Sequence, residues 1–217
     1  MSGSARVTAE VGAVVVAYLL GSIPVADLVA RRRAGVDLRR VGDRNPGYWN
    51  AKEQLGRRAA LPVFAGDVAK GAAAALLGVV VDAVAPGDGH WWLAYACGFA
   101  AMVGHAWPVF AGFRGGRSVL TFVGAAIVLS PLTAAISIAV LLAVTAVRGF
   151  AWGARAGMFA FPFIQLVVDG PYRTAATGGL MSLIGLRFAM AAFADRADRS
   201  DRPDRPAAGD PTPDPQR

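Results

Sequence analysis

The chain contains few cysteine, histidine or acidic residues. Its 217 residues include one Cys, two His and 15 Asp or Glu, against 22 Lys or Arg. The single Cys97 lies within an apolar run and cannot form a disulfide inside the chain, so it does not report the redox compartment. No segment repeats at a fixed period, and no convincing Ser-His-Asp combination is present. A disulfide framework, a repeat protein and a serine triad are therefore not indicated.

Apolar residues, by contrast, make up 55% of the chain, and the mean hydropathy is +0.44. An ordinary soluble domain is about half apolar even with glycine counted. Several apolar runs reach the length of about 20 residues that a helix needs to cross the hydrocarbon core. We therefore predict an all-α integral membrane protein. The runs cover residues 11–30, 63–85, 91–113, 119–129, 132–147, 156–168 and 175–193.

The first run is predicted to be a retained membrane helix rather than a secretory signal. A signal carries its positive charges before its apolar core, whereas here Arg6 stands alone in front and three arginines, Arg31, Arg32 and Arg33, follow. Because Lys and Arg remain cytoplasmic, the N-terminus is predicted to lie outside the cell.

The stretch 119–147 can form one long helix or two short ones. One helix would be about 43 Å long at about 1.5 Å per residue, and Ser130-Pro131 offers a break. With the break, 20 of the 22 basic residues lie inside or at the inner end of a helix; without it, eight lie outside. We therefore predict seven crossings and a cytoplasmic C-terminus.

Residues 1–194 are thus predicted to form a seven-helix membrane domain with cytoplasmic loops at 31–58, 113–118 and 148–155. Residues 195–217 alternate six Asp with five Arg among prolines and predict a disordered cytoplasmic tail. The net charge of +7 reflects these inner loops, which attract anionic lipid head groups, and does not indicate nucleic-acid binding.

Ionisable side chains inside membrane helices are costly and tend to face an interior cavity. Asp27 follows Pro24 in the first helix, where a kink would bring it to the inner surface beside Arg31. Asp67 and Lys70 are three residues apart, so they share a helix face and can pair. At the cytoplasmic end of their helix, such a pair is either structural or a substrate anchor. His105 is either a packed histidine or a catalytic one.

Two cytoplasmic loops combine glycine turns with arginines. In GHAWPVFAGFRGGRS (104–118), Arg114 and Arg117 flank Gly115-Gly116. Glycines allow backbone N–H groups to converge on an anion, and arginine forks match phosphate oxygens. The loop 31–58 holds nine basic residues together with the turn formers Gly42, Asn45-Pro46-Gly47 and Asn50. Together these loops predict a phosphorylated ligand that is approached from the cytoplasm.

The order of these motifs resembles the bacterial acyl-phosphate:glycerol-3-phosphate acyltransferases, the PlsY family. The resemblance covers residues 18–124 and rests on LLGSIPVADLV, LRRVGDRNPGYWN, GDVAKG and GHAWPVFAGFRGGRSVLT. It implies an enzyme of the bacterial inner (plasma) membrane with seven helices, which transfers an acyl group from acyl phosphate to glycerol 3-phosphate. It also implies no metal or cofactor, and membrane lipids around the acyl chain.

The resemblance assigns residues to roles. The catalytic residues that we predict are His105, Arg117 and Lys70. The residues predicted to bind substrate are Asn45, Gly47, Asn50, Asp67, Arg114, Gly115, Gly116 and Ser118.

The chain departs from the family pattern at several positions. Asp43 stands where the family has serine, Arg44 where it has glycine, Glu53 where it has arginine, and Arg117 where it has lysine; Phe188 and Ala191 replace a histidine and an asparagine. Three functions therefore remain open: an acyltransferase, including one with a related polar acceptor; an inactive homologue that retains the lipid groove; and a small anion transporter. The oligomeric state is also open.

Overall fold

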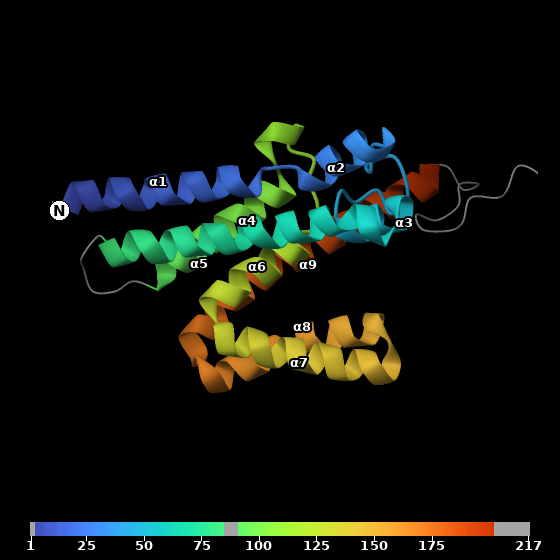
Figure 1. Cartoon of the computed structure of the whole chain (residues 1–217). Helices are drawn as coiled ribbons and strands as arrows, with labels where there is room; N and C mark the ends of the chain where they lie inside the picture. The colour runs from blue at the N-terminus through green and yellow to red at the C-terminus, as the bar shows by residue number, and fades with distance from the viewer. Residues whose placement is uncertain (1–2, 85–90, 202–217) are drawn as a thin grey trace, which may run out of the picture.

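The described residues, 3–84 and 91–201, contain helices and no strands in the computed structural model (Figure 1). The helices are α1 (Gly3–Gly21), α2 (Val25–Ala34), α3 (Tyr48–Leu55), α4 (Arg57–Val84), α5 (Trp92–Ala106), the 3-10 turn η1 (Val109–Ala111), α6 (Val119–Leu129), α7 (Pro131–Arg148), α8 (Phe150–Val168) and α9 (Pro171–Asp201).

Six helical segments of the described chain are long and apolar enough to cross a membrane. They are α1 with α2, α4, α5 with η1, α7, α8 and α9, whereas the apolar helix α6 has only 11 residues. Among the exposed side chains are many large apolar ones, such as Phe159, Phe163 and Val167. An outward-facing apolar surface of this kind suits lipid rather than water, so the helices form an integral membrane bundle.

The bundle is built around α4 and α5, against which α1 and α6 pack (Figure 1). Small residues permit the close contacts: a Cβ on Gly71 of α4 would collide with the carbonyl of Thr121 on α6, and one on Gly124 of α6 with the carbonyl of Val68. Such backbone contacts drive helix association in lipid, where apolar burial adds little. Helices α7 and α8 form an antiparallel hairpin that packs on the rest mainly through α6 and α9.

The predicted break at Ser130-Pro131 is confirmed, because α6 ends at Leu129 and α7 begins at Pro131. Proline fits the first position of a helix, where its missing N–H is not needed. Ser130 Oγ also accepts a hydrogen bond of 2.6 Å from Nε2 of the fully buried Gln165, which in turn donates to the Tyr95 hydroxyl at 3.1 Å. The break is therefore fastened to α5 and α8 by buried polar groups.

Two of the predicted loops contain helices. The segment 148–155 is almost entirely helical, since only Gly149 separates α7 from α8; its φ of +87° suits glycine and allows the sharp reversal. The segment 31–58 contains the end of α2, all of α3 and the start of α4. The polar composition of these residues concealed their helices. The loop 113–118, in contrast, lies between η1 and α6 and is not helical.

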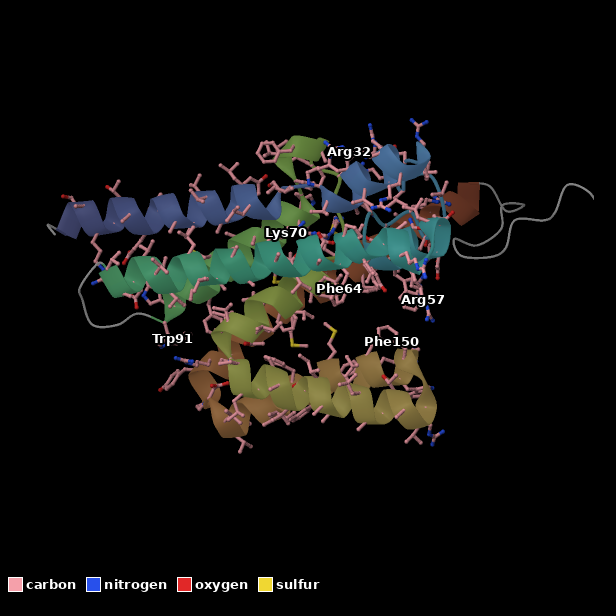
Figure 2. All side chains as sticks on the ribbon, viewed as in Figure 1. Arg32, Arg57, Phe64, Lys70, Trp91 and Phe150 are labelled. Atoms are coloured by element: carbon pink, nitrogen blue, oxygen red, sulfur yellow. The ribbon has the colours of Figure 1, made fainter. Side chains whose placement is uncertain are left out.

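The position of the Asp67–Lys70 pair also differs from the prediction. Helix α4 begins at Arg57, before its apolar run, so Asp67 and Lys70 lie near its middle and not at its cytoplasmic end. Figure 2 shows Lys70 about midway between Arg57 and Trp91. At the other end of the chain, α9 continues to Asp201, so residues 195–201 of the predicted disordered tail are helical. The rest of that tail lies outside the described residues.

Candidate active site

Asp67, Lys70 and His105 form a buried polar cluster between α4 and α5. Lys70 Nζ lies 2.9 Å from Asp67 Oδ1, which confirms the predicted pair, and His105 Nδ1 lies 3.5 Å from the same oxygen. Lys70 also donates to the carbonyl oxygen of Ile23 at 3.1 Å, in the break between α1 and α2. The three side chains are at most 8% exposed. A buried ion pair is costly unless hydrogen bonds satisfy it, and here the kinked first helix supplies one.

This cluster lines a small pocket, a cavity of about 10 Å³, which is room for about one water molecule. Besides the three polar residues, its walls include Gly115, Gly116 and Pro46. The loop 113–118 and the loop before α3 therefore meet at the pocket, as predicted from their composition. The predicted residues that line it are Asp67, Lys70, His105, Gly115 and Gly116; those that do not are Asn45, Gly47, Asn50, Arg114, Arg117 and Ser118.

The two glycines act differently from the prediction. The N–H of Gly115 donates to the carbonyl of Ala106 at 3.2 Å, and that of Gly116 to the carbonyl of His105 at 3.1 Å. These donors are therefore not directed at an anion. A Cβ on Gly115 would collide with the carbonyl of His105, and one on Gly116 would collide with its Nε2 atom. Glycine is required here because the loop folds tightly over the histidine.

A second ion pair faces the same pocket. Asp27 accepts a hydrogen bond from Arg39, and both residues line the pocket. Arg39 Nε also donates to the carbonyl of Arg114 at 2.8 Å, so one arginine ties α2 to the glycine loop. The Arg114 side chain itself is exposed. Asp27 does lie beside Arg31, four residues on in α2, as predicted. Its side chain is only 8% exposed and bonds to Arg39, so it does not reach the surface.

The predicted asparagines shape the loop before α3. Asn50 is fully buried, and its Nδ2 donates to the carbonyls of Leu38, Val41 and Asn45 at 2.9–3.2 Å. The backbone N–H of Asn45 donates to Asp43 Oδ1 at 3.1 Å, which closes a local turn. Gly47 precedes α3 and packs against the Asn45 side chain. These residues hold Pro46 at the pocket wall.

Three positions that differ from the family pattern contact one another, although none of them lines the pocket. Arg117 Nη1 donates to Asp43 Oδ2 at 2.9 Å, and the Arg117 guanidinium lies 4.7 Å from the centre of the Phe188 ring. The next residue, Ser118, is buried and donates from its hydroxyl to the Met102 carbonyl at 2.7 Å. The substitutions at 43, 117 and 188 therefore form one contact cluster, which no local sequence pattern indicated.

Arg187 of α9 was not among the predicted site residues. Its Nη2 donates to the carbonyl of Gly115 at 2.8 Å and its Nε to that of Gly116 at 3.1 Å, while its guanidinium lies 5.1 Å from the centre of a Trp107 ring. A planar fork suits two adjacent carbonyls. The signal in the sequence was an arginine within the apolar run 175–193. The carbonyls that it contacts lie 71 and 72 residues away along the chain.

Within residues 3–84 and 91–201, no three His, Cys, Asp or Glu side chains gather closely enough to hold a metal ion. The arrangement as a whole offers cationic side chains and a nitrogen base around a small pocket, inside an apolar helical bundle. The pocket thus places charged groups beside the apolar helices.

Comparison with known proteins agrees with the resemblance. The family model for glycerol-3-phosphate acyltransferase matches residues 11–197. Glycerol-3-phosphate acyltransferase 5 of Dehalococcoides mccartyi is 35% identical over 181 residues, which cover 80% of this chain and 75% of that protein. The glycerol-3-phosphate acyltransferase of Rubrobacter xylanophilus is 47% identical over 122 residues, covering 56% of this chain and 58% of that protein.

A solved structure shows the same architecture. The crystal structure of PlsY, an integral membrane glycerol 3-phosphate acyltransferase, in its glycerol 3-phosphate form matches with a TM-score of 0.72 at 28% identity, covering 91% of this chain and 94% of that one. Its lysophosphatidic acid form matches with a TM-score of 0.68 at 25% identity, over the same shares of the two chains. The chain therefore belongs to the glycerol-3-phosphate acyltransferase family.

Proposed function

We propose that the protein transfers an acyl group from acyl phosphate to glycerol 3-phosphate at the inner side of the bacterial plasma membrane. The acceptor hydroxyl bonds to the acyl carbonyl carbon as the bond from that carbon to the phosphate oxygen breaks. Lysophosphatidic acid and inorganic phosphate result, and the hydroxyl proton is balanced on the released phosphate. Acyl phosphate is an activated donor, so holding the two reactants together supplies much of the rate.

The arrangement of the helices supports seven crossings with the N-terminus outside and the C-terminus inside. Successive helices α4 to α9 alternate in direction along the long axis of the molecule, including the short α6 (Figure 1). The start of α1 and the junction between α6 and α7 lie toward one end of the molecule. The last turns of α2 and α7, which carry arginines, lie toward the other end. Placing the arginine-rich end inside satisfies the charge preference of membrane proteins.

The proposed roles follow from position. Lys70 and Arg117 bring positive charge to the phosphates, and such charge stabilises the transition state as charge develops on the carbonyl and leaving oxygens. His105 lies at the pocket wall, in contact with Asp67 and Gly116, where it is placed to contact the reacting groups. Asn45, Gly47 and Asn50 form the loop that closes over the acceptor, and Arg114 and Ser118 flank the glycine turn.

The pocket that unites Asp67, Lys70 and His105 with both cytoplasmic loops carries this proposal. The test uses the purified protein in detergent, with palmitoyl phosphate and glycerol 3-phosphate, and measures lysophosphatidic acid and released phosphate. Arg117→Ala should lower turnover at least about a hundredfold, since a donor to a transition state supplies that much. Arg148→Ala, at an exposed arginine that ends α7, should leave turnover unchanged.

Failure would separate the remaining functions. A folded wild-type protein that releases no phosphate with glycerol 3-phosphate, but does so with another polyol, would indicate a different acceptor. No release with any acceptor would indicate an inactive homologue. Uptake of labelled phosphate into proteoliposomes would indicate a transporter.

A further inference from the structure

Asp43 and Arg117 form an ion pair between the loop before α3 and the loop before α6. The carboxylate oxygen Oδ2 lies 2.9 Å from Arg117 Nη1, within the range of a charge-assisted hydrogen bond. The other oxygen, Oδ1, accepts the backbone N–H of Asn45. The turn therefore holds the carboxylate on the arginine.

The rest of the Arg117 guanidinium is oriented by its surroundings. One face packs on the Phe188 ring at 4.7 Å, and the Nε atom is buried with no hydrogen-bond partner. A buried donor without a partner is costly. Asp43 leaves Nε unsatisfied, so its carboxylate matches the donors of the guanidinium only in part.

The pair is accessible, in contrast to the other ion pairs of the site. The Asp43 and Arg117 side chains are 23% and 22% exposed, whereas those of Asp67 and Lys70 are 2% and 5% exposed. A ligand from the cytoplasm can therefore exchange with Asp43 without opening the bundle. The deeper pair is more enclosed, so exchange there requires the surrounding groups to move.

We propose that Asp43 is an internal competitor for the phosphate group of a substrate at Arg117, and so sets the affinity of the site for anions. The inference rests on the proposed function for the identity of the substrate. A phosphate oxygen and the Asp43 carboxylate accept from the same guanidinium, and two anions at one cation repel each other. A ligand must therefore bind Arg117 strongly enough to displace this tethered carboxylate, as a dianionic phosphate can.

The experiment measures binding directly, so it does not depend on turnover. Purified full-length protein in detergent is titrated calorimetrically with glycerol 3-phosphate and, separately, with inorganic phosphate and acetate. Asp43→Asn is the main variant because its amide oxygen can still accept the Asn45 N–H, and Asp43→Ser is the second. Glu53→Gln on α3 is the control, because it removes one negative charge from an exposed residue of the same region.

We expect Asp43→Asn to lower the Kd for both phosphate ligands about tenfold, the scale of one charge-assisted hydrogen bond. Acetate competes with the same carboxylate, so its Kd should fall by a comparable factor. In an Arg117→Ala background the same change should have no effect on Kd. KM measurements show which of the two substrates binds Arg117. Acyl phosphate and glycerol 3-phosphate are varied in turn, and the substrate that contacts Arg117 is the one whose KM falls in Asp43→Asn.

Several results would overturn the inference: an unchanged or raised Kd in both Asp43 variants, an equal fall in Glu53→Gln, or no binding of phosphate to any variant. Tighter binding in Asp43→Asn by a protein without acyl-transfer activity would refute the proposed function and leave the competition at Arg117 intact. Turnover by the wild type together with an unchanged Kd in Asp43→Asn would support the proposed function and refute the competition at Arg117.

Discussion

Replacing Lys70 by methionine tests whether the buried cluster contributes to stability as a charge pair. Methionine retains most of the volume and removes the ammonium group, so Asp67 would keep only His105 Nδ1, at 3.5 Å, of its two basic partners. Removing one partner of a buried pair costs about 3–5 kcal/mol. The remaining contact with His105 favours the lower figure, and about 3 kcal/mol corresponds to a fall in Tm of about 6–12 °C for a chain of this size.

The assay is thermal unfolding in detergent, with Asp67→Asn/Lys70→Met as the companion variant. The double variant removes both charges, so it should regain most of the lost Tm, because no unpaired carboxylate stays in the bundle. Both variants should lose acyl transfer, which separates stability from chemistry. A single variant as stable as the wild type, or a double variant no more stable than the single one, would refute the assignment of the pair as mutually compensating.

Two further predictions concern the loop over His105. Gly115→Ala should lower the free energy of unfolding by about 1–3 kcal/mol and turnover by about a hundredfold, because the added methyl collides with the His105 carbonyl. The control is Gly178→Ala, which has open space around it and should change neither Tm nor rate. Arg187→Lys should lower kcat about tenfold with little change in KM, because lysine keeps the charge but loses the planar guanidinium that bonds to two carbonyls. Steady-state kinetics measure this effect, with Arg148→Lys as the control. An unchanged kcat would contradict a positioning role for Arg187.

The sequence predicted those features of the fold that depend on local chemistry. The kink between α1 and α2, the break before Pro131 and the pairing of Asp67 with Lys70 each follow from residues within a few positions of one another. Proline and glycine act on their own turn, and residues three apart share a helix face whatever surrounds them. For the same reason the family motifs could be recognised in order along the chain.

Features that depend on distant contacts could not be predicted in this way. Helix α3 and the first turn of α4 have polar sequences that fit a loop equally well, and they are helical because Ala51, Ala60 and Val63 pack together under the loop. Arg39 and Arg187 bond to carbonyls 71–75 residues away. Nothing near either arginine in the sequence indicates which backbone it meets.

Gly115-Gly116 line the pocket as predicted, but their backbone N–H groups do not act as predicted. The sequence predicts that the N–H groups of Gly115-Gly116 bind phosphate, yet these groups donate to the carbonyls of Ala106 and His105. With the backbone already engaged, the positive charge available to a ligand comes from side chains. Lys70, Arg39 and Arg117 each face a carboxylate, at Asp67, Asp27 and Asp43. Binding of a phosphate at this site therefore requires an exchange of partners, and the most exposed of these pairs is the one at which that exchange costs least.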